Sequence, residues 1–455
     1  RPPCLSRNRT GNSNMQHCDS LIASRWCIPI EPAGTVLENH AVAVVDDRIA
    51  AILPREEARE AFQPSVRVER PGPVLVPGLI NTHVHAAMTL FRGLADDLPL
   101  DAWLREGVWP VERRFASAEL VRDGTELAIA EMLAAGITCF SDQYFFPEIV
   151  AETAVDLHMR AMIGTPVVDV PTAWAEDAAD YLSKGSDLVH DRYADHPLIS
   201  TCFAPHTTRA LSDASFTELR ILADQLDVPV HMHLHESVSE VAASVATTGK
   251  RPIERLDELG LLNSSLLAVH AVHVTPAEIG RLASAGAGVA HCPASNLKLA
   301  CGIAPVSAIL NAGVTVGIGS DGAASNNMLD ILSEIRMAAL LSRVAADGGG
   351  AIPAEQVLRM ATLDAAKVLR RDHEIGSIEP GKWADLTCID LMRCNIHEVY
   401  YPISQMVYST RSDHVSDAWV GGRHLLDQCE LTTIDCESIF RRSGDWRQRI
   451  AEFRK

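Results

Sequence analysis

The sequence lacks the cysteine pattern of a disulfide-stapled protein. Its 11 cysteines are an odd number, and no two of them stand in a CxxC spacing. Disulfide frameworks use even numbers of closely spaced cysteines, so none is predicted here. We expect reduced thiols packed in the interior of a cytoplasmic protein.

Long apolar runs and an excess of positive charge are also missing. No run approaches the roughly 20 apolar residues that cross a bilayer, and residues 1–14 are polar without the apolar core of a secretory signal. Lys and Arg number 40 against 59 Asp and Glu, which gives a formal net charge of -19. Nucleic acids and anionic membranes would not attract such a chain, so we expect neither as a partner.

The chain is rich in apolar residues, and short apolar runs alternate regularly with amphipathic stretches. It has 455 residues, of which 47% are hydrophobic and 22% charged, so it can form a large soluble core. Eight short apolar runs alternate with amphipathic stretches: Leu79–His85, Gly136–Asp142, His158–Thr165, Leu198–His206, Val228–Glu236, Leu266–His270, Ala287–His291 and Val314–Asp321. Eight such alternations predict a closed parallel (β/α)8 barrel, with an open doubly wound sheet as the alternative.

The two flanks of the barrel have a strand-and-turn pattern instead. Val36–Leu53 predicts a β-hairpin around Asp46 and Asp47, and Gly376–Asp390 and His414–Leu426 predict further strands. Strands from both ends should pair into one small β-sandwich domain. The expected organisation is a disordered leader over 1–17, a sandwich from 18–78 and 376–430, a barrel over 79–375 and a closing helix over 431–455.

Two histidines stand at the predicted end of the first barrel strand. His83 and His85 are two residues apart, so on a strand both side chains project to the same face. The carboxyl ends of barrel strands carry the chemistry of such folds. Two imidazoles there could bind one metal ion at about 2.0–2.1 Å. By itself an HxH pair is equally compatible with two incidental histidines.

The fifth and eighth runs strengthen the case for a metal. His231, His233 and His235 alternate along one run and would share a face, so spacing alone does not choose among them. Buried imidazoles need polar partners, which makes three inward histidines hard to explain as core. The eighth run delivers Asp321 to the barrel rim, where a buried carboxylate needs a cation or strong donors. His270 ends the sixth run.

Several long strings resemble one superfamily. PGLINTHVHAAMTLFRG, HMHLHES, AVHAVH, HCPASNLKLACGIAPV and SDGAASNN are similar to the amidohydrolases, in particular the 5′-methylthioadenosine/S-adenosylhomocysteine deaminases, from about Cys18 onward. The resemblance implies one divalent metal per chain, with zinc as the expected ion. It assigns the ligands to His83, His85, His233 and Asp321. The fourth run, LISTCFAPHT, has no Lys that could be carboxylated to bridge two metals, which favours a mononuclear site.

The resemblance also assigns catalytic roles. Glu236, three residues after His233, would move a proton from the metal-activated water to N1 of a purine ring, as a general acid–base. His270 would orient that water. Asp321 would accept a proton that leaves with ammonia. Glu236 and Asp321 would thereby also contact the substrate.

Further substrate contacts are implied at other positions. His206 ends the fourth run and matches a substrate-contacting histidine. Glu112 matches the acid that binds the ribose hydroxyls, and a carboxylate can accept both protons of a vicinal diol. Without the resemblance, Glu112 would pass for an ordinary surface residue. Ser295 and Asn296 are expected to line the pocket.

The expected reaction is hydrolytic deamination of the adenine ring of 5′-methylthioadenosine, S-adenosylhomocysteine or adenosine to the inosine analogue and ammonia. The alternatives are deamination of a free purine or pterin base, dechlorination of a triazine, and an inactive scaffold of the same fold. A scaffold should have lost metal ligands, and all four are present. The HxE…PCxxC site of deaminases that act on nucleic-acid bases is absent. We expect a small-molecule nucleoside substrate and a homo-oligomer.

Overall fold

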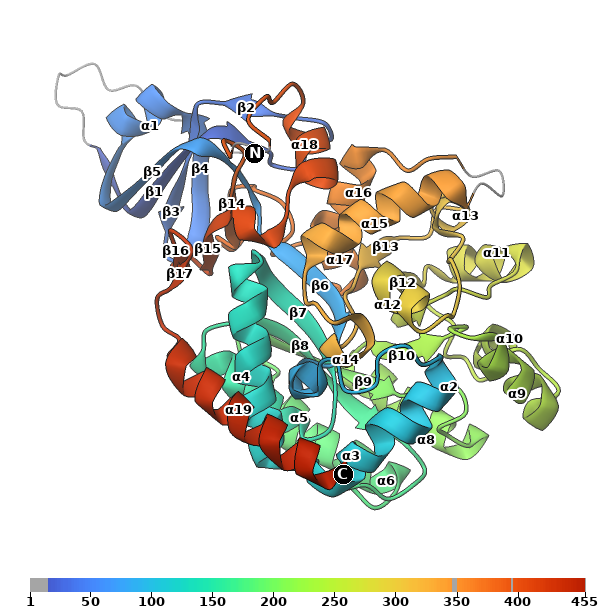
Figure 1. The fold of residues 1–455 in the computed structure, drawn as a ribbon. Coiled ribbons are helices and arrows are strands. Elements are labelled where there is room, and N and C mark those ends of the chain that lie inside the picture. The colour runs from blue at the N-terminus through green and yellow to red at the C-terminus, as the bar shows by residue number, and fades with distance from the viewer. Residues whose placement is uncertain (1–14, 346–349, 394–395, 455) are drawn as a thin grey trace.

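Eight parallel strands form a barrel at the centre of the structure (Figure 1). The computed structural model describes residues 15–345, 350–393 and 396–454. The barrel strands are neighbours in sequence order: β6 (Leu79–Val84), β7 (Ile137–Gln143), β8 (Arg160–Val167), β9 (Ile199–Pro205), β10 (Val230–Leu234), β11 (Leu266–His270), β12 (Gly288–His291) and β13 (Val316–Ile318). The bounds of β6 to β12 agree with the predicted runs to within two residues, and β13 ends three residues before its run does, so the (β/α)8 prediction is confirmed.

The last strand closes against the first. The backbone N–H of Asp321, just beyond β13, donates to the backbone carbonyl of His83 at 3.0 Å. At Gly317 the two strands approach so closely that an added Cβ would lie 2.6 Å from Cγ2 of Thr82. Only glycine fits there. This closure excludes the open doubly wound sheet and brings His83 and Asp321 side by side.

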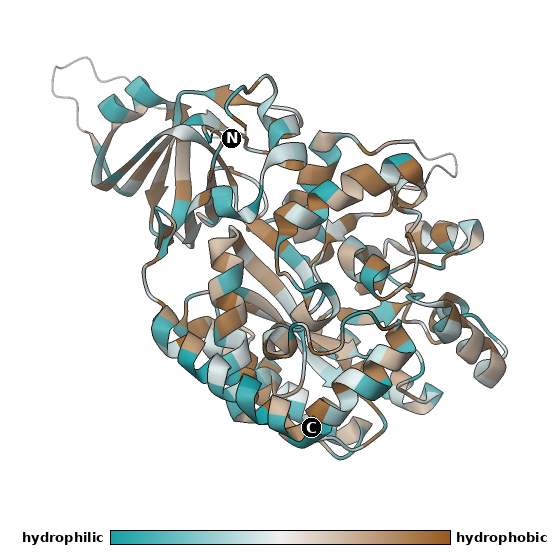
Figure 2. Cartoon of the chain, in the orientation of Figure 1, coloured by the Kyte–Doolittle hydropathy of each residue, from teal (hydrophilic) through white to brown (hydrophobic). Residues whose placement is uncertain are grey.

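Helices surround the barrel, with apolar faces inward and polar faces outward (Figures 1 and 2). Around the barrel lie α2 (Leu100–Ala102), α3 (Trp109–Phe115), α4 (Ala118–Ala134), α5 (Pro147–Asp156), α6 (Ala178–Lys184), α7 (Asp191–Tyr193), α8 (Asp213–Leu226), α9 (Val238–Thr248), α10 (Pro252–Glu258), α11 (Pro276–Ala285), α12 (Pro293–Lys298), α13 (Val306–Asn311), α14 (Ala323–Asn326), α15 (Ile331–Val344), α16 (Ala354–Met360) and α17 (Leu363–Val368). Serine side chains cap several of them; Ser117, for example, accepts the backbone N–H of Leu120 at the start of α4. The helices thus shield the outer surface of the barrel and leave its carboxyl end for chemistry.

Strands from both chain ends build one mixed sheet beside the barrel. Its strands are β1 (Gln16–Cys27), β2 (Leu37–Glu38), β3 (His40–Val45), β4 (Arg48–Pro54), β5 (Phe62–Pro77), β14 (Leu386–Asp390), β15 (Val415–Val420), β16 (Arg423–Asp427) and β17 (Glu430–Leu431), with α1 (Arg55–Ala61) and α18 (Pro402–Ser409) packed nearby. The two ends join where β5 pairs with β14. One apolar cluster, including Ile22, Leu386 and Trp419, takes residues from both halves of the sheet. The small domain predicted from both termini is confirmed.

The first turn of this domain is as predicted, whereas its start differs slightly from the sequence prediction. The turn between β3 and β4 has Asp46 and Asp47 in the left-handed region, at φ 48° and 65°, as expected for a tight hairpin. β1 begins at Gln16, two residues before the predicted boundary at 18. Residues 1–14 of the predicted leader lie outside the described residues.

The C-terminal helix α19 (Cys436–Phe453) lies along the outside of the barrel beside α4 (Figure 1). Trp446 is buried and its indole Nε1–H donates to Asp123 on α4 at 2.7 Å. Within the described segments no helix combines the length and apolar character needed to cross a membrane. The cysteines of those segments are free thiols, and all but Cys429 and Cys436 are buried.

A buried ion pair fastens the barrel to the small domain. Arg160 at the start of β8 donates through Nε to Asp385 at 2.6 Å and through Nη2 at 3.1 Å. The backbone N–H of Gly421 donates to the same carboxylate at 2.7 Å. Both side chains are almost fully buried. The pair lies at the amino-terminal end of the strands, away from the carboxyl-terminal mouth of the barrel.

Replacing Arg160 should destabilise the protein without impairing the chemistry. Arg160→Met leaves the Asp385 carboxylate buried and uncompensated, which costs about 3–5 kcal/mol. We expect a lower urea midpoint but an unchanged kcat for folded protein. The control is Arg411→Met, which breaks an exposed pair with Asp413 and should leave the midpoint in place. Equal midpoints for both variants would contradict the assigned role of the buried pair.

Candidate functional site

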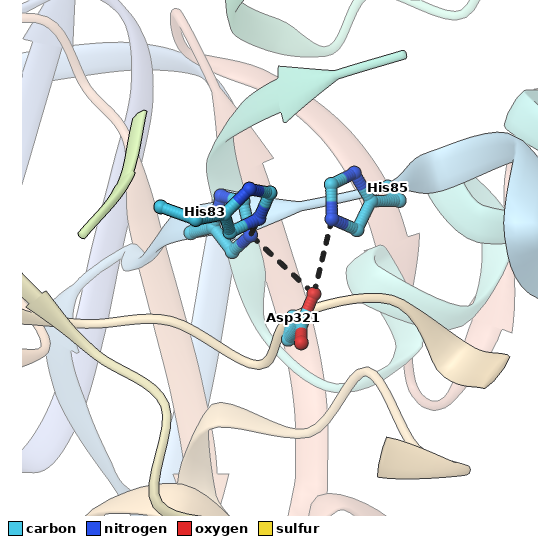
Figure 3. Close-up of side chains that lie close together, drawn as sticks. His83, His85 and Asp321 are labelled. Atoms are coloured by element: carbon cyan, nitrogen blue, oxygen red, sulfur yellow. Dashed lines mark hydrogen bonds and ion pairs between the residues drawn. The ribbon is translucent and has the colours of Figure 1, made fainter. Parts of the chain in front are cut away.

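Three imidazoles and one carboxylate meet at the carboxyl mouth of the barrel. His83 and His85 come from the end of β6, His233 from β10, and Asp321 from just beyond β13. One ligand atom from each side chain lies within 4.8 Å of the others. Figure 3 shows His83 and His85 both directed toward the Asp321 carboxylate. The structure therefore brings together the four residues predicted as ligands.

The spacing of these atoms suits one tetrahedral ion. Oδ1 of Asp321 lies 3.4 Å from Nε2 of His83 and 3.2 Å from Nε2 of His85. Nε2 of His233 lies 3.1 Å from Nε2 of His83. A tetrahedral ion with bonds of about 2.0–2.1 Å holds its ligand atoms roughly 3.3 Å apart. The four side chains could hold a divalent metal with little rearrangement.

The remaining ring nitrogens support the same conclusion. Nδ1 of His85 donates to the backbone carbonyl of Gln143 at 2.5 Å, and Nδ1 of His233 donates to that of His206 at 2.8 Å. A carbonyl can only accept, so each Nδ1 carries a proton, and Nε2 of each ring is the nitrogen left to bind a metal ion. Metal-binding histidines are oriented in this way by their second ring nitrogen.

His83 is oriented by a further histidine. Its Nδ1 lies 2.9 Å from Nε2 of His231, whose own Nδ1 lies 3.1 Å from the Ser141 hydroxyl. Burial lowers the pKa of His83 to about 3 and that of His231 well below its usual value, so both rings are neutral. His231 thus supports a ligand instead of being one, which sequence spacing could not decide.

His235 does not share the face of the other two histidines, so that prediction was wrong. β10 ends at Leu234, and His235 has a left-handed φ of 55°. Its ring turns away, accepting the backbone N–H of Ile253 at 3.2 Å and lying 3.1 Å from the carbonyl of His273. Strand alternation fails here because the strand has already ended.

Asp321 is held by donors on both oxygens. The Ser295 hydroxyl donates to Oδ2 at 2.6 Å, and the backbone N–H of Gly322 donates to Oδ1 at 2.7 Å. Burial raises the pKa of Asp321, but His83 and His85 outweigh it, and the pKa lies well below its usual range. Its φ of 60° places it in a left-handed turn, a backbone conformation that clusters at functional sites. Asp321 is therefore a fixed anion facing the imidazoles.

Glu236 and His270 flank the cluster. The Glu236 carboxylate is buried, and its Oε1 lies 3.7 Å from Nε2 of His270. Burial raises the pKa of Glu236. Its backbone N–H donates to Glu240 at 2.7 Å, which fixes the turn after β10. The His270 ring stacks on His233, with centroids 5.3 Å apart. Two groups able to move protons thus lie beside the four ligand atoms.

The predicted substrate residues have well-defined surroundings. Glu112 on α3 accepts a hydrogen bond from the Tyr144 hydroxyl at 2.8 Å, and burial raises its pKa. His206, just after β9, has its ring centroid 4.9 Å from that of His233. Burial lowers the pKa of His206 to about 4, so its ring is neutral.

Sequence reasoning missed a group of residues at the end of β7. Ser141 contacts His231, and the Gln143 carbonyl orients His85. Between them, Asp142 accepts the backbone N–H of Ala86 at 2.7 Å, and burial raises its pKa to about 6. The signal that could have revealed this group is the run of three polar residues, Ser141-Asp142-Gln143, at the end of a strand whose other residues are mostly apolar.

A second acidic cluster, in the small domain, is an ion-pair network. Asp417, His424 and Asp427 offer ligand atoms close together. Arg70 already lies between the carboxylates, with Nη2 2.5 Å from Asp417 and 2.7 Å from Asp427. Burial raises the pKa of Asp417, but His424 and Arg70 outweigh it and hold the pKa at about 2. The guanidinium supplies the positive charge that a metal would otherwise bring.

Comparisons with known proteins agree with this geometry. The sequence pattern of the amidohydrolase family matches residues 74–425. A 5-methylthioadenosine/S-adenosylhomocysteine deaminase of Teredinibacter turnerae is 42% identical over 96% of this chain and 99% of its own. A zinc-bound adenosine deaminase structure from Xanthomonas campestris is 47% identical, with a TM-score of 0.95, over 96% of this chain and all of its own. A zinc-bound atrazine chlorohydrolase structure from Arthrobacter aurescens TC1 is 25% identical, with a TM-score of 0.87; the match covers 94% of this chain and 99% of the chlorohydrolase chain.

Proposed function

The chain belongs to the amidohydrolase family, and from this premise we propose that it deaminates the adenine ring of 5′-methylthioadenosine and S-adenosylhomocysteine, with adenosine as a further substrate. The products are the corresponding inosine analogue and ammonia. The single observation that carries the proposal is the complete His83, His85, His233 and Asp321 cluster with Glu236 beside it. An inactive scaffold is expected to have lost some of these metal ligands, and all four are present.

We assign the four clustered side chains to one divalent ion, expected to be zinc, the metal bound in the similar adenosine deaminase. A bound divalent ion supplies a nucleophile at neutral pH, because it lowers the pKa of water from 15.7 to about 7. The Nδ1 contacts described above fix three rings so that their Nε2 atoms are directed to one point. The donor set is therefore organised before the ion arrives.

The protein side chains would handle the protons. Adding water across C6 and N1 of the adenine ring needs one proton delivered to N1, and Glu236, with its raised pKa, is suited to carry it. Expelling the amino group as ammonia needs a second proton, which Asp321 would take from the attacking water and pass on. His270 would hold that water by accepting a hydrogen bond at Nε2. Loss of ammonia leaves the C6 carbonyl of the inosine analogue.

Glu112 would select nucleosides over free bases. One of its oxygens already accepts from Tyr144, which fixes the orientation of the carboxylate. Its remaining lone pairs can accept the 2′- and 3′-hydroxyls of a ribose. The neutral His206 ring, close to His233, is placed to contact the base.

The test of the proposed function is an ammonia-release assay over adenosine, 5′-methylthioadenosine, S-adenosylhomocysteine, guanine and 8-oxoguanine. We expect turnover of the adenine nucleosides and none of the free bases. Turnover of guanine alone would replace the proposal with free-base deamination. No turnover by metal-loaded protein would favour the scaffold alternative.

Replacing Glu112 should weaken the use of ribonucleosides specifically. A hydrogen bond to a charged partner contributes roughly 1.5–3 kcal/mol, so Glu112→Ala should lower kcat/KM for a ribonucleoside by roughly 10–150-fold. The same variant should barely change the already low rate on a 2′,3′-dideoxy analogue. Glu106→Ala, an exposed acid on the same connection, is the matched control and should behave as wild type. If Glu112→Ala lowers kcat/KM by the same factor for the ribonucleoside and for the dideoxy analogue, Glu112 does not bind the ribose.

We also propose a cytoplasmic, homo-oligomeric enzyme that acts on a small molecule and not on nucleic acid or a membrane. The net charge of -19 and the buried free thiols support this assignment. Light scattering on purified protein, with and without added DNA, tests it; a monomer or a DNA complex would contradict it.

A further inference from the structure

The two ring nitrogens of His270 have different neighbours. Nδ1 lies 2.8 Å from the side-chain oxygen Oδ1 of Asn296, and Nε2 faces Glu236 at 3.7 Å. An amide oxygen can only accept a hydrogen bond. Nδ1 must then carry a proton, so the uncharged form of the ring has its lone pair on Nε2, the nitrogen that faces the catalytic centre.

The Asn296 side chain is not needed to hold its own segment. The backbone N–H of Asn296 donates to the carbonyl of Cys292 at 3.1 Å, and its backbone carbonyl accepts from Cys301 at 2.8 Å. These bonds are independent of the side chain and anchor α12 to the loop that follows. The side chain is therefore available for His270.

The side-chain NH2 group of Asn296 indicates that the residue does more than stabilise the fold. The residue is 1% exposed, and its Nδ2 has no hydrogen-bond partner among the residues that the structure describes. A buried donor left unpaired costs about 1–3 kcal/mol. A residue present for stability alone would not carry that donor, whereas its carbonyl oxygen makes a short, specific contact.

We infer that Asn296 is a positioning residue that sets the tautomer of His270, holding the proton on Nδ1 so that Nε2 is an acceptor at the catalytic centre. The inference rests on the proposed function, because it concerns how His270 takes part in that reaction. It extends that function by assigning to the asparagine of HCPASN a task that neither the metal cluster nor the substrate contacts explain. With the opposite tautomer, Nε2–H would be a donor and could not accept from water.

Two substitutions of nearly the same volume as asparagine distinguish the effect of the side-chain carbonyl oxygen from that of side-chain size. Asn296→Asp keeps an oxygen acceptor and has no donor when ionised, whereas Asn296→Leu keeps the volume and removes the acceptor. At the pH optimum of each variant, we expect Asp to retain kcat within about tenfold. We expect Leu to lose about 10–100-fold in kcat, by analogy with the loss of residues that orient metal-ligating histidines, with KM little changed. Equal losses in both variants, or no loss in Leu, would overturn the inference.

A second readout does not depend on activity. In protein carrying ring-¹⁵N histidine, the His270 signals are identified by their disappearance in His270→Gln. Wild type should show a protonated Nδ1 and a bare Nε2, and Asn296→Leu should lose this preference. The reverse tautomer in wild type would overturn the inference even if Asn296→Leu did not fold.

A matched control separates structural damage from tautomer control. Asn263 donates to the carbonyl of Gly260 at 3.1 Å and accepts from Ser265 at 2.8 Å, just before β11 and at the opposite end of that strand from His270. Asn263→Leu should lower the melting temperature and leave kcat and the His270 tautomer unchanged. If the wild-type protein releases no ammonia from any nucleoside, the proposed function is refuted. If the wild type is active but Asn296→Asp and Asn296→Leu lose kcat equally, only the role of Asn296 is refuted.

Discussion

Asp321→Ala should lower the bound metal well below one ion per chain and abolish measurable turnover. The variant removes one of four ligand atoms and the only carboxylate among them, and four ligands are the usual number for a tightly held zinc. It also removes the group proposed to pass a proton to ammonia. His83→Ala should have the same consequence for the metal, because its Nε2 lies centrally between His233 and Asp321. Elemental analysis and ammonia release measure both effects.

The control for this prediction lies in the small domain. Asp427→Ala alters the acidic cluster that Arg70 already neutralises, so metal content and turnover should stay at wild-type values. Two ions per active wild-type chain would contradict the mononuclear site. Metal loss in Asp427→Ala would show that the Arg70 network also binds an ion.

Glu236→Gln should separate proton transfer from metal binding. Glu236 is not among the four clustered ligands, so the variant should keep its metal. An amide of the same shape cannot carry the proton, and general acid–base transfer typically contributes about 10²–10⁴-fold to kcat. We expect a loss of that size, with substrate binding largely preserved. Single-turnover and steady-state rates, with metal content measured on the same samples, provide the test.

Glu258→Gln is the matched control, because Glu258 is exposed and pairs only with Lys250 in the described structure. It should leave kcat unchanged. If Glu236→Gln stays within about threefold of wild type, Asp321 or His270 carries the proton instead. Loss of metal in Glu236→Gln would place Glu236 among the ligands and revise the site.

Much of the fold followed from local pattern. The eight apolar runs became β6 to β13 because alternation of strands and amphipathic helices has few compact solutions. The Asp46-Asp47 turn was predictable because aspartate, with its short polar side chain, tolerates left-handed backbone. The eighth strand was predicted too long: β13 ends at Ile318, since Asp321 adopts a left-handed turn that also presents its carboxylate.

The residue types of the site were likewise present in the sequence, but their individual tasks were not. Alternation places His231 and His233 on one face without saying which ring reaches an ion. That depends on β6 and its His83, which meets His231 at one nitrogen and His233 at the other. No local feature of the sequence indicated that Ser141 contacts His231 or that Tyr144 donates to Glu112.

The sequence by itself determined the barrel, the small domain and the placement of His83, His85 and Asp321 at strand ends, because strand period is a local property. The choice of His233 as a ligand and the role of Glu236 were implied by the family resemblance and not by spacing. Only the tertiary structure decided that His231 supports His83, that His235 turns away, and that Asn296 faces Nδ1 of His270. The physical reason is that a hydrogen bond depends on distances and directions between atoms far apart in the chain. Those are set by barrel closure, and no single strand encodes them.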